Sequence, residues 1–290
     1  MTKRIIALGF FDGVHLGHRA LLDRTRTLAD DLGAQACALT FDRSPGKGRL
    51  LTSLDERTRL LKTLGRMDEV LVLPFDEALM RTPWDVFADH LIRQYDAAAL
   101  VCGWDYRFGA DAAGDDLKLA SFCAARGIRC AVLPPVVKYG KTVSSTLLKS
   151  LIASGEMEQA ALYYGHPHTL SGTVVSGRGL GHRLGFPTAN LTPDERLLLP
   201  KTGVYAVRGL ADGAVYTGVC NVGSKPTVQG GSLTVETWLA DFAGDLYGKT
   251  LTVEFYKYLR PERKFDSLDA LTAEIRRNQA EASAYFNQRP

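Results

Sequence analysis

Two histidines, His15 and His18, flank a glycine near the start of the chain in the pattern H-x-G-H. The pattern follows a short apolar run at residues 5–8 and precedes residues with helical spacing, so it lies where a strand gives way to a helix. A helix N-terminus offers free N–H groups and a positive dipole end to a phosphate, and Gly17 lets the backbone approach closely. Imidazoles there donate hydrogen bonds to phosphoryl oxygens and stabilise developing charge. The pattern therefore predicts a phosphate site.

A second string, G-R-G-L-G-H-R-L-G-F-P-T-A-N, occupies residues 177–190. Three of its glycines fall within five residues and form a flexible loop that can turn backbone N–H groups toward an anion. Thr188 and Asn190 are two residues apart, so in an extended chain their side chains face the same side. Their oxygens suit Mg²⁺ that bridges nucleotide phosphates. The string predicts a second nucleotide site.

The first half of the chain must position the histidines. It alternates longer amphipathic segments with short apolar runs, which occupy residues 5–8, 36–39, 70–73, 99–102 and 130–133. Each run is too short for a stable helix and suits a strand that is buried on both faces. Strands that alternate with helices predict a parallel sheet with helices on both faces, and ligands bind at the carboxyl ends of such strands.

The second half has a different pattern from about residue 170 onward. Short alternating runs, with Asp212-Gly213 and Gly230-Gly231 as turn signals between them, predict a small antiparallel barrel. A last amphipathic helix starts near Ser267. We expect two domains, residues 1–155 and 156–290.

Composition excludes several classes of protein. The length of 290 residues suits two domains, and 46% hydrophobic with 23% charged residues is ordinary for globular chains. The net charge of +3 is too balanced to indicate a nucleic-acid or membrane partner, and no apolar run approaches a membrane span. The five cysteines show no metal spacing and the start shows no signal peptide, so we expect a cytoplasmic protein.

Residues 11–18, F-D-G-V-H-L-G-H, resemble the signature of the nucleotidyltransferase superfamily in its prokaryotic FAD synthetase branch. Residues 102–109, followed by Gly114 and Asp115, and residues 143–146 are similar to two further segments of that family. The resemblance implies a Rossmann-like domain with FMN adenylyltransferase activity, in which the two histidines are catalytic. It also implies that ATP and its phosphates bind to Gly9, Phe11, Asp12, Gly17, Asp105, Ser145, Thr146 and Lys149.

The chain departs from this family pattern at two places. Leu147 and Lys149 stand where the family has two arginines after its S-S-T motif, and Ser44 stands where it has the histidine of P-H-P. Lys141, just upstream of the first departure, is a candidate substitute cation. Both changes remove groups expected near phosphates, so they leave open a degenerate adenylyltransferase domain.

Residues 177–190 resemble the riboflavin kinase signature, and similar segments continue to about residue 265. The resemblance implies a six-stranded barrel in which the acid equivalent to Glu236 is the catalytic base, since a hydroxyl must lose a proton as it attacks a γ-phosphoryl group. It also implies that Mg²⁺ binds to Thr188 and Asn190. The ATP phosphates would bind to Gly177, Gly179, Gly181, Gly185, Pro187, Thr188 and Asn190.

Together, the resemblances identify the chain as a member of the bifunctional riboflavin kinase/FMN adenylyltransferase family. They imply ATP, riboflavin, FMN and FAD as substrates or products, and we favour a monomer without macromolecular partners. Three alternatives remain: a riboflavin kinase with an inactive first domain, another transferase, and a non-catalytic flavin- or nucleotide-binding regulator. The last would more easily have lost Glu236 or the Thr188–Asn190 pair, which this chain keeps.

Overall fold

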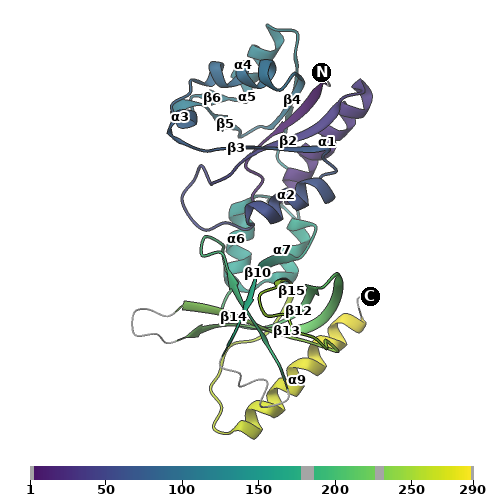
Figure 1. Cartoon of the computed structure of the whole chain (residues 1–290). Helices are drawn as coiled ribbons and strands as arrows, with labels where there is room; N and C mark the ends of the chain where they lie inside the picture. The colour runs from purple at the N-terminus through teal and green to yellow at the C-terminus, as the bar shows by residue number, and fades with distance from the viewer. Residues whose placement is uncertain (1–2, 178–185, 226–231, 289–290) are drawn as a thin grey trace. The chain divides into compact units, whose positions relative to one another are not determined.

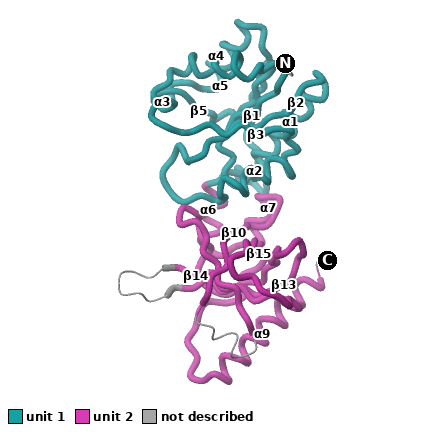
Figure 2. The backbone as a smooth tube through the Cα atoms, in the orientation of Figure 1, with its two compact units in different colours: residues 1–145 teal, residues 146–290 magenta. Residues whose placement is uncertain are grey.

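The computed structural model describes residues 3–177, 186–225 and 232–288. The chain forms two compact units, residues 1–145 and 146–290 (Figure 2). The units divide earlier than the expected boundary after residue 155, so nearly all of helix α6 (Ser145–Ser154) is counted with the second unit. The end of α6 contacts that unit directly, because the Lys201 N–H donates to the Ile152 carbonyl at 3.3 Å.

The first unit is built on a parallel sheet with strand order β3-β2-β1-β4-β7 (Figure 1). Its strands are β1 (Arg4–Leu8), β2 (Gln35–Phe41), β3 (Glu69–Leu73), β4 (Ala97–Gly103) and β7 (Arg129–Leu133). All five apolar runs predicted as strands are confirmed. Two small hairpins, β5 (Arg107–Phe108) with β6 (Gly114–Asp115) and β8 (Val137–Lys138) with β9 (Lys141–Thr142), were not predicted.

Helices cover both faces of this sheet. They are α1 (Leu16–Leu32), α2 (Leu54–Thr63), α3 (Glu77–Met80), α4 (Trp84–Gln94) and α5 (Asp116–Ala124), with a 3₁₀ turn at Ala110–Ala112. Ile5 and Ala7 of β1 pack in a core with α1 and α2, whereas Ile6 and Leu8 pack in a second core with α4 and α5. The period of two along a strand thus sends alternate apolar side chains to opposite cores.

The second unit is a closed antiparallel barrel with strand order β10-β11-β14-β13-β12-β15. Its strands are β10 (His168–Val175), β11 (Ala189–Pro193), β12 (Gly203–Ala211), β13 (Ala214–Lys225), β14 (Ser232–Leu239) and β15 (Thr250–Arg260). Helices α6, α7 (Met157–Tyr164) and α9 (Leu268–Asn287) complete the unit. The predicted fold class is confirmed in both halves.

Side chains along β14 alternate between the barrel interior and its outer face. Val235 and Thr237 are buried, whereas Glu236 and Trp238 are partly exposed. Helix α9 runs across the outside of the barrel (Figure 1), where Ala282 and Phe286 pack against Ala206 of β12. The outer face between β14 and α9 is therefore sheltered without being part of the barrel core.

Two local signals of the second unit are confirmed. Ser267 caps α9 by accepting a hydrogen bond from the Ala270 N–H, and Asp212-Gly213 forms the turn between β12 and β13 with positive φ at both residues. The Gly230-Gly231 signal lies outside the described residues. No helix in the described ranges has the length and apolar character needed to span a membrane.

His168 should make the second unit sensitive to acid. Its side chain is 2% exposed and lies beside the rings of Tyr164 and Phe255. Burial, with a smaller effect of the charge on His166, lowers the pKa of His168 to about 3. Below about pH 6.5 the unfolded chain therefore binds a proton at this histidine, whereas the folded chain binds it only near pH 3. Between these two pH values the free energy of unfolding falls by up to about 1.4 kcal/mol per pH unit.

We expect His168→Phe, which keeps an aromatic ring and removes the titration, to make the urea midpoint fall less steeply between about pH 6.5 and 5. His166→Gln serves as the control and should keep most of the wild-type slope. An unchanged slope in His168→Phe would show that other groups cause the acid sensitivity.

Candidate active sites

The loop between β1 and α1 has an unusual backbone. Phe11 and Val14 have positive φ values of 59° and 43°, and Gly13 between them has 85°. Positive φ is rare for a bulky or β-branched residue, and both Phe11 and Val14 are fully buried. Such strain persists only where the surroundings hold it, and it concentrates at functional sites.

Asp12 ties this loop to two distant segments. Its Oδ1 accepts hydrogen bonds from the N–H groups of Leu51 at 2.8 Å and Thr52 at 3.1 Å. The Gly13 N–H donates to the Thr52 hydroxyl, and the Ser145 hydroxyl donates to the Asp12 carbonyl at 3.1 Å. Three segments thus meet at the carboxyl end of β1 and hold the strained loop in place.

The loop delivers two stacked imidazoles to the N-terminus of α1. His15 caps the helix, and its Nδ1 accepts a hydrogen bond from the His18 N–H at 3.3 Å. The two rings stack with centroids 3.6 Å apart, and the edge of Phe11 meets His18 at 5.3 Å. A neutral imidazole that accepts at Nδ1 carries its proton at Nε2, so His15 presents an N–H donor there.

His18 is held in its neutral form. Burial, followed by the charges of His15 and Arg57, lowers its pKa well below the usual 6.5. Its Nδ1 is buried and contacts no hydrogen-bond partner in the described part of the chain. His18 is thus suited to donating a hydrogen bond to an anion at the helix N-terminus in its neutral form.

Two glycines at this site have packing roles. A Cβ on Gly17 would lie 3.1 Å from the His15 ring and 3.4 Å from the Val143 carbonyl. A Cβ on Gly9 would lie 3.0 Å from the Phe11 ring. Both glycines therefore leave room for side chains of the site itself, a reason that the sequence pattern did not indicate.

The other predicted residues of the first site lie just after β4 and on α6. Asp105 is exposed just after β4, the parallel neighbour of β1, so it shares the sheet edge of the histidine loop. Ser145 contacts the loop through its hydrogen bond to Asp12. Thr146 and Lys149 lie on α6, in the second compact unit.

A row of polar side chains crosses three strands of the barrel. Glu236 on β14 lies directly opposite Asn190 on β11 and opposite Asn221 on β13. Beyond these three polar residues, the line of directly opposed residues continues from Asn221 to the apolar Val204 on β12, and from Val204 to Arg260 on β15. Directly opposed residues project to the same face of a sheet, so these side chains share the outer face of the barrel.

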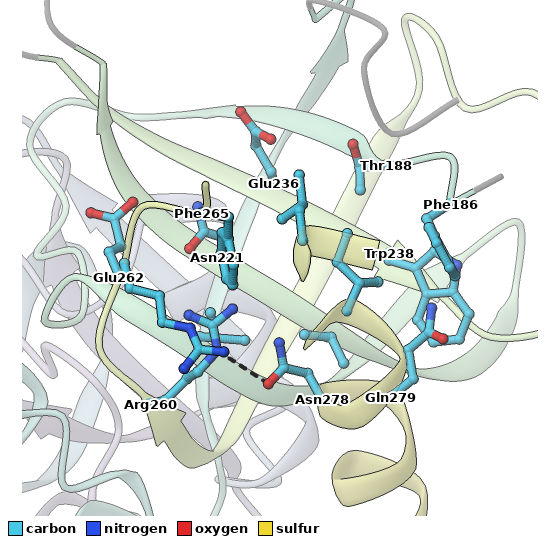
Figure 3. A pocket seen from close by; sticks show the side chains of 15 residues that line it. Phe186, Thr188, Asn221, Glu236, Trp238, Arg260, Glu262, Phe265, Asn278 and Gln279 are labelled. Atoms are coloured by element: carbon cyan, nitrogen blue, oxygen red, sulfur yellow. Dashed lines mark hydrogen bonds between the residues drawn. The ribbon is translucent and has the colours of Figure 1, made fainter. Parts of the chain in front are cut away.

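A cavity of about 320 Å³ lies between this face and α9. Figure 3 shows Glu236 and Thr188 on one side of it, with Arg260 and Asn278 across from them. Trp238, Phe186 and Phe265 supply aromatic surface to the lining. The cavity combines apolar walls with a carboxylate and a hydroxyl at one rim, which suits a flat aromatic ligand with a reactive polar tail.

Ion pairs fix the wall opposite Glu236. The Arg260 Nε bonds to Glu274 at 3.0 Å and to the Asn278 Oδ1 at 3.2 Å, and Arg263 also pairs with Glu274. Glu274 and Asn278 are both buried on α9. This network holds α9 against the end of β15 and keeps the cavity open between them.

A second hollow of about 240 Å³ shares Thr188 with the first. It is lined by Pro187, Phe242 and Tyr247, among others, and does not include Glu236. Thr188 is thus shared by two adjoining hollows, of which the first is lined by Glu236 and the second by Asp245.

Gly177 packs against Asn190, because a Cβ on Gly177 would overlap the Asn190 amide. The other predicted glycines of this string, Gly179, Gly181 and Gly185, lie outside the described residues. Within the described ranges, no cluster of three or more His, Cys, Asp or Glu side chains is arranged to hold a metal ion.

Comparisons with known proteins agree with this two-site arrangement. The FAD synthetase family matches residues 1–147, and the riboflavin kinase family matches residues 164–286. A bifunctional riboflavin kinase/FMN adenylyltransferase of Listeria monocytogenes is 31% identical over 98% of this chain and 93% of its own length. The chain belongs to the bifunctional riboflavin kinase/FMN adenylyltransferase family. A relative of the same name from Pseudomonas fluorescens is 36% identical over 97% of this chain and 92% of its own length.

A solved structure supports the fold of the whole chain. It is described as a macrolide-efflux protein from Streptococcus pneumoniae and matches with a TM-score of 0.88 at 28% identity, covering 97% of this chain and 94% of its own. The membership in the riboflavin kinase/FMN adenylyltransferase family that the motifs predicted is confirmed.

Two residues of this family member were not predicted as site residues. Asn221 lies beside Glu236 only through strand register. Arg57 lies on α2, far along the chain from the histidine motif, and packs over the Phe10 ring of the loop that leads to it. No local sequence signal marks either residue, because their importance arises from packing.

Proposed function

We propose that the second unit transfers the γ-phosphoryl group of ATP to the 5′-hydroxyl of riboflavin, and that the first unit joins the resulting FMN to AMP from a second ATP. The observation that supports the kinase is the meeting of two hollows at Thr188. One hollow contains a carboxylate and aromatic walls for the flavin, and the other takes the nucleotide, so the γ-phosphoryl group would lie between them.

In the kinase reaction, a bond forms between the ribityl oxygen and the γ-phosphorus while the bond from that phosphorus to the bridging oxygen of ADP breaks. Glu236 accepts the proton of the attacking hydroxyl. Asn221 and Asn190 stand opposite Glu236 on the two neighbouring strands, so their side chains flank it on the same face of the barrel.

In the adenylyl transfer, an oxygen of the FMN phosphate attacks the α-phosphorus of ATP, and pyrophosphate leaves with the electron pair of the broken bond. The chain needs no covalent chemistry for this step. His15 and His18 donate hydrogen bonds to the phosphoryl oxygens, and the N-terminus of α1 adds its positive dipole end.

The oxygens of Thr188 and Asn190 form a donor set that fits Mg²⁺, with the Glu236 carboxylate opposite Asn190. A bound Mg²⁺ neutralises charge on the nucleotide phosphates. We expect Thr188→Ala to raise the Mg²⁺ concentration for half-maximal FMN formation by about 10- to 100-fold. Thr192→Ala, at an exposed position of β11, the strand that begins just after Thr188, should leave it unchanged. An unaltered Mg²⁺ requirement in Thr188→Ala would remove that residue from the metal site.

The whole proposal is tested by one incubation of the chain with riboflavin, ATP and Mg²⁺, followed by chromatographic separation of the flavins. FAD that accumulates after FMN supports both activities. A reaction that stops at FMN would favour the alternative of a kinase with an inactive first unit, and the changes at Ser44 and Leu147 would then be its leading explanation. That the chain acts as a cytoplasmic monomer without nucleic acid stays a prediction.

A further inference from the structure

A second carboxylate, that of Glu262, lines the cavity that also contains Glu236. It belongs to residues 261–267, which connect β15 to α9. Figure 3 shows the side chain of Asn221 between the two carboxylates. The kinase reaction proposed above uses Glu236 as its base and leaves Glu262 without a part.

Gly223 on β13 makes room for this second carboxylate. A Cβ at Gly223 would overlap the carboxylate of Glu262 and would lie 2.9 Å from the Nδ2 of Asn221. Glu262 therefore lies over the face of β13, close to the amide of Asn221. Gly223 and Asn221 are two residues apart on one strand, so both belong to the face on which Asn221 stands opposite Glu236.

Two arginines stand close to Glu262 in the sequence, but both bind another acid. Arg260 and Arg263 pair with Glu274 on α9, and Arg260 also bonds to Asn278. Among the residues that the structure describes, Glu262 has no hydrogen-bond or ion-pair partner. A carboxylate accepts hydrogen bonds at both of its oxygens, so this wall of the cavity offers an open acceptor group to a ligand.

We propose that Glu262 accepts hydrogen bonds from the secondary hydroxyls of the ribityl chain, and so selects flavins that carry a polyol. The inference rests on the proposed kinase function, which puts the 5′-hydroxyl at Glu236. Opposed residues on neighbouring strands have Cβ atoms about 5 Å apart. A chain of hydroxyl-bearing carbons that leaves Glu236 therefore passes Asn221 and comes to Glu262. The flavin ring offers a carboxylate only its imide N–H, at the end of the ring remote from the ribityl chain.

The direct test titrates the full chain with two flavins and follows flavin fluorescence, without ATP or Mg²⁺. One flavin is riboflavin, and the other carries a 5-hydroxypentyl chain, which keeps the terminal hydroxyl and lacks the secondary ones. We expect Glu262→Ala to raise the Kd of riboflavin by about 10-fold, as for the loss of a hydrogen bond to a charged group, and to leave the Kd of the analogue unchanged. Glu262→Gln, which keeps one acceptor oxygen, should lose less. Asp266→Asn, an exposed acid of the same connection outside the cavity lining, is the matched control and should bind both flavins as wild type does.

Three results of this titration would overturn the proposal. An equal loss of affinity for both flavins in Glu262→Ala would assign the residue to the shape of the cavity. An unchanged affinity for riboflavin would remove it from the flavin site. Riboflavin methylated at the imide nitrogen should lose as much affinity in Glu262→Ala as riboflavin does, and the absence of that loss would place the contact at the ring edge instead.

The kinetic test measures FMN formation at saturating ATP and Mg²⁺. Glu262→Ala should raise the KM for riboflavin by about 10-fold with little change in kcat, because the contact is the same in the ground state and the transition state. A fall in kcat alone, or a higher Mg²⁺ requirement, would make Glu262 part of phosphoryl transfer and overturn the proposal. A wild-type chain that binds riboflavin but makes no FMN contradicts the proposed function instead, and the comparison of the two flavins still decides the role of Glu262.

Discussion

Glu236→Gln should lower the turnover number for FMN formation by about 10²- to 10⁴-fold, with little change in the KM for riboflavin. Glutamine keeps the size of the side chain and one acceptor oxygen but cannot accept the proton of the attacking hydroxyl. The cavity walls stay in place, since Glu236 takes no part in the network of Arg260, Glu274 and Asn278 that holds α9. The loss should therefore fall on the chemical step and not on binding.

Two controls separate this effect from damage to the fold. Glu254→Gln changes a carboxylate of the same unit, on β15, that bonds to the Tyr256 hydroxyl and does not line the cavity, so kinase activity should be unchanged. FAD formation from added FMN by the Glu236→Gln chain should also match wild type, because that step belongs to the first unit. Full kinase activity in Glu236→Gln would exclude it as the base.

The fold could be predicted where burial alone decides the structure. The apolar runs of the first half are strands buried on both faces, and runs of this kind can be recognised in the sequence alone. Strand β11 was not predicted, because A-N-L-T-P has only one large apolar residue, Leu191, and ends in proline. Its extended form comes from pairing with β10 on one side and β14 on the other. A strand of this kind is determined by its neighbours and not by its own residues.

The residues of the candidate sites also divide into those that the sequence could identify and those that it could not. His15, His18 and Glu236 could be found because they stand in motifs. Asn221 and Arg57 could not, because the first depends on the register between β13 and β14 and the second on how α2 packs over β1 and β2. Sequence spacing carries no information on either contact.

The sequence also did not show every reason why a particular position is glycine. Gly17 was predicted to let the backbone approach a phosphate, and the structure shows that it also makes room for the His15 ring. A motif can thus be located correctly from the sequence although one reason for its glycine, the space taken by the His15 ring, becomes visible only in the structure.

The second variant with a large expected effect changes His18 in the first unit. His18→Ala should lower the turnover number for FAD formation by about 10²- to 10³-fold, the usual cost of removing one preorganised donor from a site of developing charge. His18 lies at the N-terminus of α1 between Phe11 and His15, so its loss also removes the ring on which His15 stacks. FMN formation by the same chain should be unchanged, which makes the second unit an internal standard for concentration and folding.

His90→Ala is the matched control for this variant. His90 is an exposed histidine of the same unit, on α4, whose core contacts lie on the opposite face of the sheet from α1. We expect it to keep wild-type FAD formation. His18→Asn, which restores a side-chain N–H donor, should recover part of the activity lost in His18→Ala if hydrogen bonding to the phosphoryl oxygens is the role of His18. Unchanged FAD synthesis in His18→Ala would contradict the assignment, and a loss that His18→Asn does not relieve would place the role of His18 in its ring, as the partner that holds His15 in position.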